Sequence, residues 1–155
     1  MDYSSVNLAK YMHIGHLSTT VIGESIARTY ENLGYKVIRI NYIGDYGTPF
    51  GKMVYAYLNW GEGLNIEQGG IDFIQNLYVE FNKRAEEDPK LDDYAREYFK
   101  KIEDKDPEIY PIYEQIIKIS VAEAKRILNM LDVTFDSFKG EASYTDNLTD
   151  IVKEI

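Results

Sequence analysis

The stretch NLAKYMHIGHLSTT, residues 7–20, decides the expected fold, and it contains both histidines of the chain, His13 and His16. Before it, the run DYSSV at residues 2–6 predicts a short strand that leads into a loop. After it, apolar residues recur at helical spacing and predict a helix over about residues 16–33, which ends at a glycine. The two histidines are therefore expected where the loop after a strand enters a helix.

The segments that follow predict a second strand and another helix. The run YKVIRINYIG, residues 35–44, has apolar side chains on both faces, as in a buried parallel strand. Strand, helix and strand within about 42 residues predict a right-handed βαβ unit. In GDYGTPFGK, residues 44–52, three glycines mark a turn where the backbone comes close to another group. Thr48 is expected to cap a helix that begins at Pro49 and runs to about Asn59.

The rest of the chain has mainly helical patterns. From residue 71 apolar residues recur at helical spacing in two stretches, one before Asp88 and one after it. The sequence DPE at residues 106–108 predicts the capped start of a further helix that runs to about Leu131. Residues 133–138 are a candidate strand, and a polar turn follows them.

The composition narrows the class of protein. The 155 residues have room for one domain or part of one. We expect no membrane partner and no secretory signal, because no segment is long and apolar enough to span a bilayer and the start lacks a basic and apolar pattern. The absence of cysteine excludes disulfides and a cysteine nucleophile, and it fits a reduced, cytoplasmic setting.

The charge is unevenly distributed along the chain. The formal net charge is −9, yet residues 1–61 carry five basic and four acidic side chains, a net charge of +1. The remaining residues therefore carry −10, which is typical of a solvated helical surface. If the chain binds a polyanion, we expect the first 61 residues to bind it.

The histidines are candidates for binding phosphate. A helix N-terminus presents free N–H groups and a partial positive charge, and two imidazoles can donate hydrogen bonds to oxygens whose charge grows in a transition state. Gly15 between them would let a bulky ligand approach the backbone. The alternative is that one histidine caps the helix while the other packs. Lys10 would add a mobile positive charge, or is simply a surface lysine.

Other polar residues gather at the same end of the first strand. Ser5 and Asn7 are candidate ligand contacts, or they only stabilise backbone turns. Two histidines without cysteine are too few for a typical structural zinc site, so no metal ligand is expected. The chain has no G-x-x-x-x-G-K-[ST], G-x-G-x-x-G or G-x-S-x-G motif.

Taken together, residues 2–52 resemble the start of the catalytic domain of arginyl-tRNA synthetase, a class I aminoacyl-tRNA synthetase. HIGH at residues 13–16 matches the ATP-binding signature of that class. The pattern SS-x-N-x-AK before it, and GYKVIRIN and GDYG-x-x-FGK after it, are specific to the arginine enzyme. The later stretch VTFDSFKGEASY also resembles this family, so the resemblance covers essentially the whole chain.

The resemblance and the patterns lead to one expected fold class. It is α/β, a partial Rossmann-like parallel sheet of the class I synthetase (HUP) type with a large helical insertion, helix-rich overall. Residues 1–61 would form the first half of the nucleotide-binding fold. Residues 62–132 would form the helical insertion, and residues 133–155 a strand and tail that return toward the catalytic core.

The resemblance also implies a reaction and a set of site residues. In this family ATP and arginine form arginyl-adenylate, and arginine then passes to tRNA(Arg). Mg²⁺ accompanies ATP, and no organic cofactor is needed. By motif, the catalytic residues would be His13, His16 and Lys10. ATP would be bound by His13, Gly15, His16 and Lys10, and arginine by Asp2, Ser5, Asn7 and His16.

The chain departs from the family in four positions and in length. Val6 and Tyr11 replace residues that are commonly proline, Ser18 replaces a basic residue, and Pro49 replaces a frequent glutamine. These changes are expected to loosen the loop. No KMSKS-like sequence is present, so we expect a piece of the enzyme that is inactive or only weakly ligand-binding by itself.

Two alternatives remain open at this point. One is a non-catalytic nucleotide-binding module, or one that self-associates through an unfinished sheet edge. The other is a different nucleotidyltransferase with an HxGH motif, against which the GDYG segment and the helical tail speak.

Overall fold

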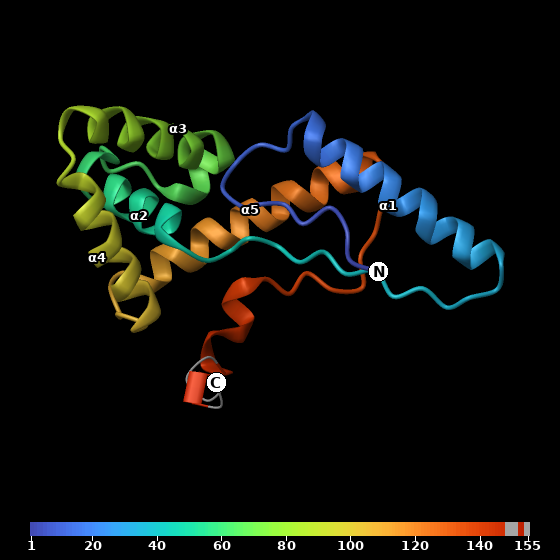
Figure 1. Ribbon diagram of the computed structural model, residues 1–155. Helices are drawn as coiled ribbons and strands as arrows, with labels where there is room; N and C mark the ends of the chain where they lie inside the picture. Colours follow the sequence, from blue (N-terminus) through green and yellow to red (C-terminus); the bar gives the residue numbers. More distant parts are fainter. Residues whose placement is uncertain (148–151, 154–155) are drawn as a thin grey trace. The chain divides into compact units, whose positions relative to one another are not determined.

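The computed structural model describes residues 1–147 and 152–153 (Figure 1). The expected tail of residues 133–155 therefore lies partly outside the described residues. In the described part the chain forms α helices and one short 3-10 helix, η1. Their bounds are α1 Ile14–Asn32, α2 Thr48–Trp60, α3 Ile66–Glu87, α4 Leu91–Glu103, α5 Tyr110–Met130 and η1 Glu141–Asn147.

The expected parallel sheet is wrong, because residues 1–147 and 152–153 contain no β-strand. The segments expected as strands meet only at isolated parallel bridges. These bridges join Asp2 to Ile40, Asn7 to Gly44, and Ile40 to Ser137. The α/β, Rossmann-like fold class is thus corrected to a helical chain in which extended segments touch at single points.

Local backbone geometry explains why no ladder extends from these bridges. Ser4 and Ser5 have φ angles of 73° and 47°, in the left-handed region, so the chain leaves the extended conformation between the first two bridges. Near the third bridge the carboxylate of Asp136 accepts the Arg39 N–H at 2.7 Å. In a regular β-ladder the Arg39 N–H would donate to a backbone carbonyl oxygen, but here it donates to the Asp136 side chain.

The chain divides into two compact units. Unit 1 comprises Met1–Leu8, Met12–Asp45 and Ala124–Ile155, and unit 2 comprises Ala9–Tyr11 and Tyr46–Glu123. The three-part division expected from the sequence stays a prediction. No helix within the described residues is both long and apolar enough to cross a membrane.

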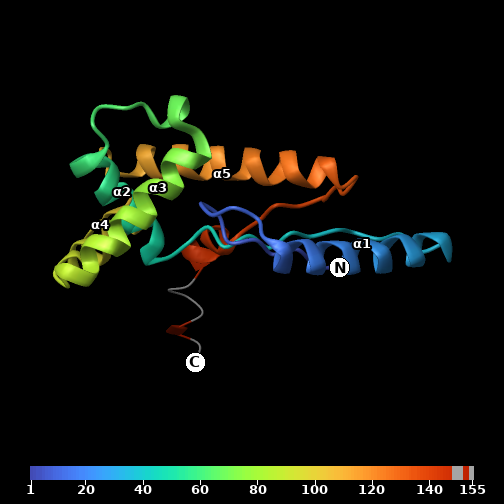
Figure 2. The same cartoon turned by 90° about the horizontal axis from the view of Figure 1, so that it is seen from above.

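In unit 1 the segment after α1 runs back beside that helix (Figures 1 and 2). The chain reverses at Gly34, whose φ of 89° favours glycine. Small residues on α1 permit close packing. The Tyr3 ring lies so near Gly23 that a Cβ there would be 2.3 Å from Tyr3 Cγ. Ala27, one turn further on, is fully buried.

The carboxylate of Glu24 connects several parts of unit 1. It accepts hydrogen bonds from the Tyr3 hydroxyl at 2.5 Å, Arg28 Nε at 2.7 Å and Arg39 Nε at 3.2 Å. Arg39 also forms an ion pair with Glu31 at 2.6 Å. The side chains of Glu24 and Arg39 are only 10% and 13% exposed. Each buried charge is therefore compensated by an opposite charge, as burial requires.

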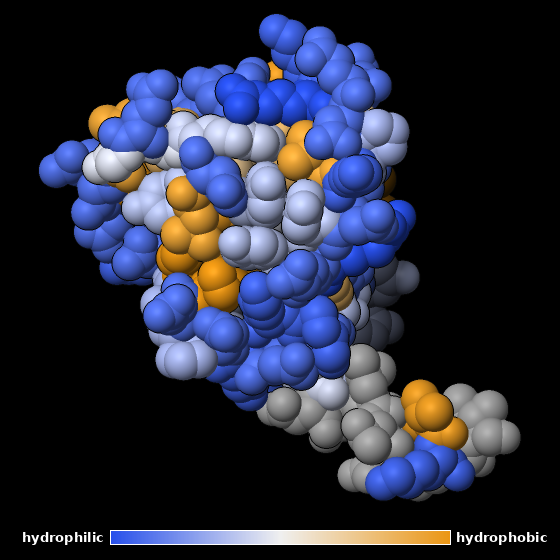
Figure 3. Space-filling view, turned by 90° about the vertical axis from the view of Figure 1, so that its left-hand side faces the viewer, coloured by the Kyte–Doolittle hydropathy of each residue, from blue (hydrophilic) through white to orange (hydrophobic). Residues whose placement is uncertain are grey.

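In unit 2 the helices α2, α3 and α4 enclose an apolar cluster. Its buried members are Ala56, Leu77, Phe81, Leu91 and Ala95. Gly51 lets α2 approach α4 closely, because a Cβ at that position would be 2.0 Å from the Ala95 carbonyl oxygen. Lys52 and Asp92 join the same two helices by an ion pair of 2.9 Å. Figure 3 views the chain from the side of α3 and α4, where most side chains are hydrophilic.

Two helix starts differ from those expected. Gly47 is the N-cap of α2, and Thr48 is its first helical residue rather than its cap. Asp106 caps the turn before α5, because its Oδ1 accepts the N–H of Glu108 at 2.9 Å, but α5 itself begins at Tyr110. Both differences move a boundary by a few residues and leave the helices in place.

The Glu24 network predicts a pH-dependent stability. Burial raises the pKa of Glu24, but hydrogen bonds from Arg28, Tyr3 and Arg39 outweigh it and hold the pKa below its ordinary range. The stabilisation is present above the pKa of the unfolded chain and is lost as the pH falls through the lower folded value. We expect Glu24→Gln to cost about 2 kcal/mol near neutral pH.

Urea unfolding from about pH 6 to about pH 3 would measure this loss. The original chain should lose more stability than Glu24→Gln over that interval. Glu80→Gln is the matched control, because Glu80 forms an exposed ion pair with Arg84. Parallel stability curves for the original chain and Glu24→Gln would contradict the prediction.

Candidate functional site

The two histidines lie together at the start of α1. His13 is the N-cap, with φ −120° and ψ 178°, and His16 is in the first turn. Their rings stack with centroids 3.9 Å apart and planes 30° apart. His13 is exposed, whereas His16 is partly buried. Burial and the neighbouring His13 lower the pKa of His16, so the structure favours a neutral imidazole there.

Both histidines cap the helix. The Gly15 N–H donates to Nδ1 of His13 at 3.1 Å, and the His13 N–H donates to Nδ1 of His16 at 3.2 Å. This reciprocal arrangement is a capping box built from two imidazoles. The alternative in which one histidine caps while the other packs is therefore not what the structure shows. The capped helix N-terminus and both rings form one polar surface.

A buried threonine connects this surface to the preceding loop, and the sequence analysis missed it. The Thr20 hydroxyl lies 2.7 Å from the His16 carbonyl oxygen and 2.9 Å from Ser4 Oγ. Thr20 is fully buried. The only sequence signal was a threonine four residues after His16, on the same helix face. Through these two contacts of Thr20, the first turn of α1 stabilises the loop at Ser4, whose backbone and that of Ser5 are in the left-handed region.

Three of the four residues expected to bind arginine, Asp2, Ser5 and Asn7, lie in this loop, and all three are exposed. Asp2 Oδ1 accepts the Ser5 hydroxyl at 3.3 Å and the Tyr42 N–H at 3.4 Å. Asn7 lies at the bridge to Gly44. The structure thus places Asp2 and Ser5 together, and it anchors Asn7 at a separate bridge in the same unit.

The GDYG segment meets the loop at close range, as its glycines predicted. A Cβ on Gly44 would be 2.1 Å from Asn7 Oδ1. The carboxylate of Asp45, next in the chain, accepts the Ala142 N–H at 2.8 Å. Burial raises the pKa of Asp45 despite that hydrogen bond. No pattern in the sequence indicates this structural role of Asp45.

Lys10 belongs to unit 2, unlike the histidines. Its Nζ lies 4.9 Å from the centre of the Tyr78 ring, a cation–π distance. The next residue, Tyr11, donates its N–H to Gln75 Oε1 at 3.2 Å. A proline at position 11 would lack that donor. The tyrosine that departs from the family pattern therefore anchors its own backbone.

The other three residues that differ from the family pattern lie at positions that accommodate them. Val6 is buried, with 2% of its surface exposed, so it contributes to the core of unit 1. Pro49 lies in the first turn of α2, where a missing N–H is tolerated. Ser18 is exposed on α1.

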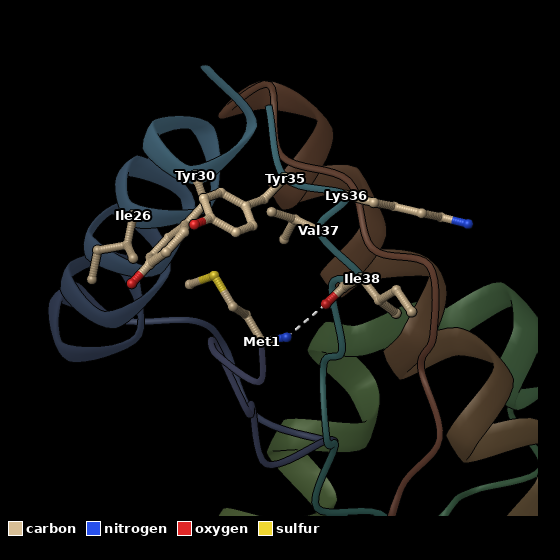
Figure 4. Close-up of a pocket in the computed structure, with 7 residues that line it drawn as sticks. All are labelled: Met1, Ile26, Tyr30, Tyr35, Lys36, Val37 and Ile38. Carbon is tan, nitrogen blue, oxygen red and sulfur yellow. Dashed lines mark hydrogen bonds between the residues drawn. The ribbon is translucent and has the colours of Figure 1, made fainter. Parts of the chain in front are cut away.

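A cavity of about 370 Å³ lies elsewhere in unit 1. Its lining residues are Met1, Ile26, Tyr30, Tyr35, Lys36, Val37 and Ile38. Figure 4 shows Met1, Ile26 and the two tyrosines around it, while Lys36 extends away, and the Met1 ammonium donates to the Ile38 carbonyl oxygen at 2.7 Å. None of the expected site residues lines this cavity. Among the described residues no group of three or more His, Asp or Glu side chains is placed to hold a metal ion.

The sequence matches the family of class I tRNA synthetases for arginine, catalytic domain, over residues 1–155. The chain belongs to the arginyl-tRNA synthetase family. An arginine–tRNA ligase of Lactobacillus acidophilus is 46% identical over 155 residues, which is 100% of this chain and 28% of that protein. One from Streptococcus suis is 48% identical over 148 residues, which is 96% of this chain and 26% of that protein.

A solved structure agrees with the family assignment. The chain is similar to arginyl-tRNA synthetase from Plasmodium falciparum, with a TM-score of 0.77 and 28% identity. The similarity covers 98% of this chain and 25% of that one. The chain therefore spans about a quarter of the length of the arginyl-tRNA synthetases it matches.

Two glycine substitutions test how closely these loops are packed. In Gly44→Ala the new Cβ meets the free end of the Asn7 side chain, which can rotate away, so we expect a cost of about 1 kcal/mol. In Gly140→Ala the Cβ would lie 2.4 Å from Cγ of the buried Asp45. That carboxylate is held, so we expect about 3 kcal/mol.

Thermal or urea unfolding of both variants gives the comparison. Nuclear magnetic resonance (NMR) of the side-chain amide of Asn7 reports its displacement in Gly44→Ala. Equal losses of stability in the two variants, with Asn7 unmoved, would contradict the geometry described above.

Proposed function

We propose that this chain supplies the part of an arginyl-tRNA synthetase that binds the phosphates of ATP and the substrate arginine. The complete reaction would be the formation of arginyl-adenylate and the transfer of arginine to tRNA(Arg). The observation that carries the proposal is the pair of stacked imidazoles at the N-terminus of a 19-residue helix. The names of the relatives, arginine–tRNA ligase, support the same reaction.

The proposed chemistry needs charge stabilisation more than proton transfer. The arginine carboxylate attacks the α-phosphorus of ATP, a P–O bond forms, and pyrophosphate leaves with the bonding electrons. Negative charge grows on the phosphate oxygens, where N–H donors from His13 and His16 and the positive end of α1 would stabilise it. The small Gly15 leaves room for the phosphates at the helix start. Lys10 stays a candidate for catalysis and ATP binding because it matches the family motif.

Magnesium would enter this site with ATP. We expect the phosphates of ATP to supply most of its ligands. The Mg²⁺ ion would neutralise phosphate charge, while the protein orients the oxygens. A cytoplasmic setting is also part of the proposal, and the absence of cysteine fits it.

Arginine binding is assigned to the loop before α1. The Asp2 carboxylate is exposed and offers a partner of opposite charge to a guanidinium group. Its Oδ1 already holds the Ser5 hydroxyl and the Tyr42 N–H, so the group is oriented. Asn7 and His16 would complete the polar contacts. Because Asp2, Ser5 and Asn7 are exposed to water, their electrostatic effect is screened, and we expect the chain alone to bind weakly and to catalyse little.

Calorimetry with ATP tests the proposal on the 155-residue chain. We expect His16→Ala to weaken ATP binding roughly tenfold or more, since it removes a hydrogen bond to a charged group. Ser18→Ala, exposed on the same helix, should bind like the original chain. If His16→Ala and Ser18→Ala both bind ATP as the original chain does, the proposed site is wrong. Arginine-dependent ATP–pyrophosphate exchange measures the residual activity.

Self-association is a second prediction, and we now assign it to the surface of α1 instead of a sheet edge. The expected sheet edge is not formed in the described residues, but α1 exposes large apolar side chains, among them Ile22, Ile26 and Tyr30. Exposed apolar surface of this kind favours pairing with a second copy. We expect Ile26→Glu to lower the fraction of dimer in sedimentation velocity runs, with Ser25→Glu as the control. A monomer at every concentration would contradict the prediction.

A further inference from the structure

The cap of α1 also determines where the imidazole protons are. A backbone N–H can only donate, so a ring nitrogen that receives it must carry a lone pair. Nδ1 of His13 receives the Gly15 N–H, and Nδ1 of His16 receives the His13 N–H. A neutral imidazole has one proton, which must then be on Nε2.

We propose that capping of α1 holds His13 and His16 as the neutral Nε2–H tautomers, so that two N–H donors point away from the cap. Within the described part of the chain, neither Nε2 has a protein partner at hydrogen-bond distance. Both donors are therefore available to an anionic oxygen, and neither has to exchange its proton first. The identity of that oxygen, a phosphate of ATP, rests on the proposed function.

The stacked geometry disfavours a charge on both rings at once. The ring centroids are 3.9 Å apart, so two imidazolium charges would repel each other strongly. Protonation at Nδ1 would also remove the acceptor that satisfies a helix N–H, and an unsatisfied N–H costs free energy. Each ring is thus a positioning group through Nδ1 and a donor through Nε2.

Gly15 also contributes to the capping arrangement of the two histidines. A Cβ at this position would lie 3.0 Å from Cε1 and 3.2 Å from Nδ1 of His13. With a Cβ there, the His13 ring would have to shift by a few tenths of an ångström from its capping position. The glycine between the histidines therefore favours the cap itself, in addition to any ligand that approaches the backbone.

NMR measures the tautomers directly. Two-bond ¹H–¹⁵N correlation of the ¹⁵N-labelled chain at about pH 8, above the ordinary histidine pKa, contains only two imidazole patterns because the chain has two histidines. Both patterns should show a protonated Nε2 and an unprotonated Nδ1 in the absence of ligand. An Nδ1–H tautomer for either ring, or an equal mixture, would overturn the proposal.

Matched variants separate the two roles of His13. In His13→Asn the amide oxygen replaces Nδ1 as the cap acceptor, and asparagine is a favoured N-cap residue, but the outward donor is lost. His13→Ala loses both. Hydrogen exchange at the Gly15 amide should stay slow in His13→Asn and become at least several-fold faster in His13→Ala. Equal exchange in the two variants would overturn the cap assignment.

ATP binding then tests the outward donor. Both His13→Asn and His13→Ala should bind ATP roughly tenfold more weakly than Ser18→Ala. If the tautomers and the exchange rates are as expected but His13→Asn binds ATP normally, the proposed function fails while the cap assignment stands. Gly15→Ala should speed hydrogen exchange at the amide of residue 15, although both histidine rings, and with them their Nε2–H donors, are still present. An unchanged exchange rate at that amide would overturn the role given to Gly15.

Discussion

The buried carboxylate of Glu24 is the interaction on which unit 1 depends. It binds the first residues through Tyr3, its own helix through Arg28, and the returning segment through Arg39. These are three stretches that no β-ladder holds together in the described residues. A charge buried to this degree is stable only when every partner is in place, so the network specifies one arrangement of the three stretches. Packing of Tyr3 on Gly23 adds an apolar contact beside it.

This arrangement has a direct effect on the site. Because Tyr3 is held against α1, the next two serines must turn sharply, and both adopt left-handed φ angles. Such angles cost about 1–2 kcal/mol for residues other than glycine. The hydrogen bonds of Thr20 to Ser4 and to the His16 carbonyl offset part of that cost. The loop that carries the candidate arginine contacts is therefore tied to the turn that carries the histidines.

Sequence reasoning located the elements better than it located their surroundings. The helix around residues 16–33, the glycines of the GDYG segment and the histidine pair were all identified from local patterns. The sheet was wrong, because apolar side chains on both faces of residues 35–44 predict extended backbone without specifying a partner register. The sequence pattern also did not predict which face of α1 is buried, since Thr20 and Glu24 are buried while Ile22 and Ile26 are exposed. Hydrophobic periodicity cannot predict a buried polar face whose desolvation cost is offset by ion pairs.

The sequence by itself determined the family and which residue types stand together at the candidate site. The spacing of His13 and His16, with glycine between them, places two imidazoles on one turn of backbone whatever surrounds them. Only the tertiary structure decided what each nitrogen does. Helix capping commits Nδ1 of both rings to backbone N–H groups, and the Ser4–Thr20 contact joins the histidine turn to the loop before it. These are contacts between groups whose distances depend on folding, so no one-dimensional pattern contains them.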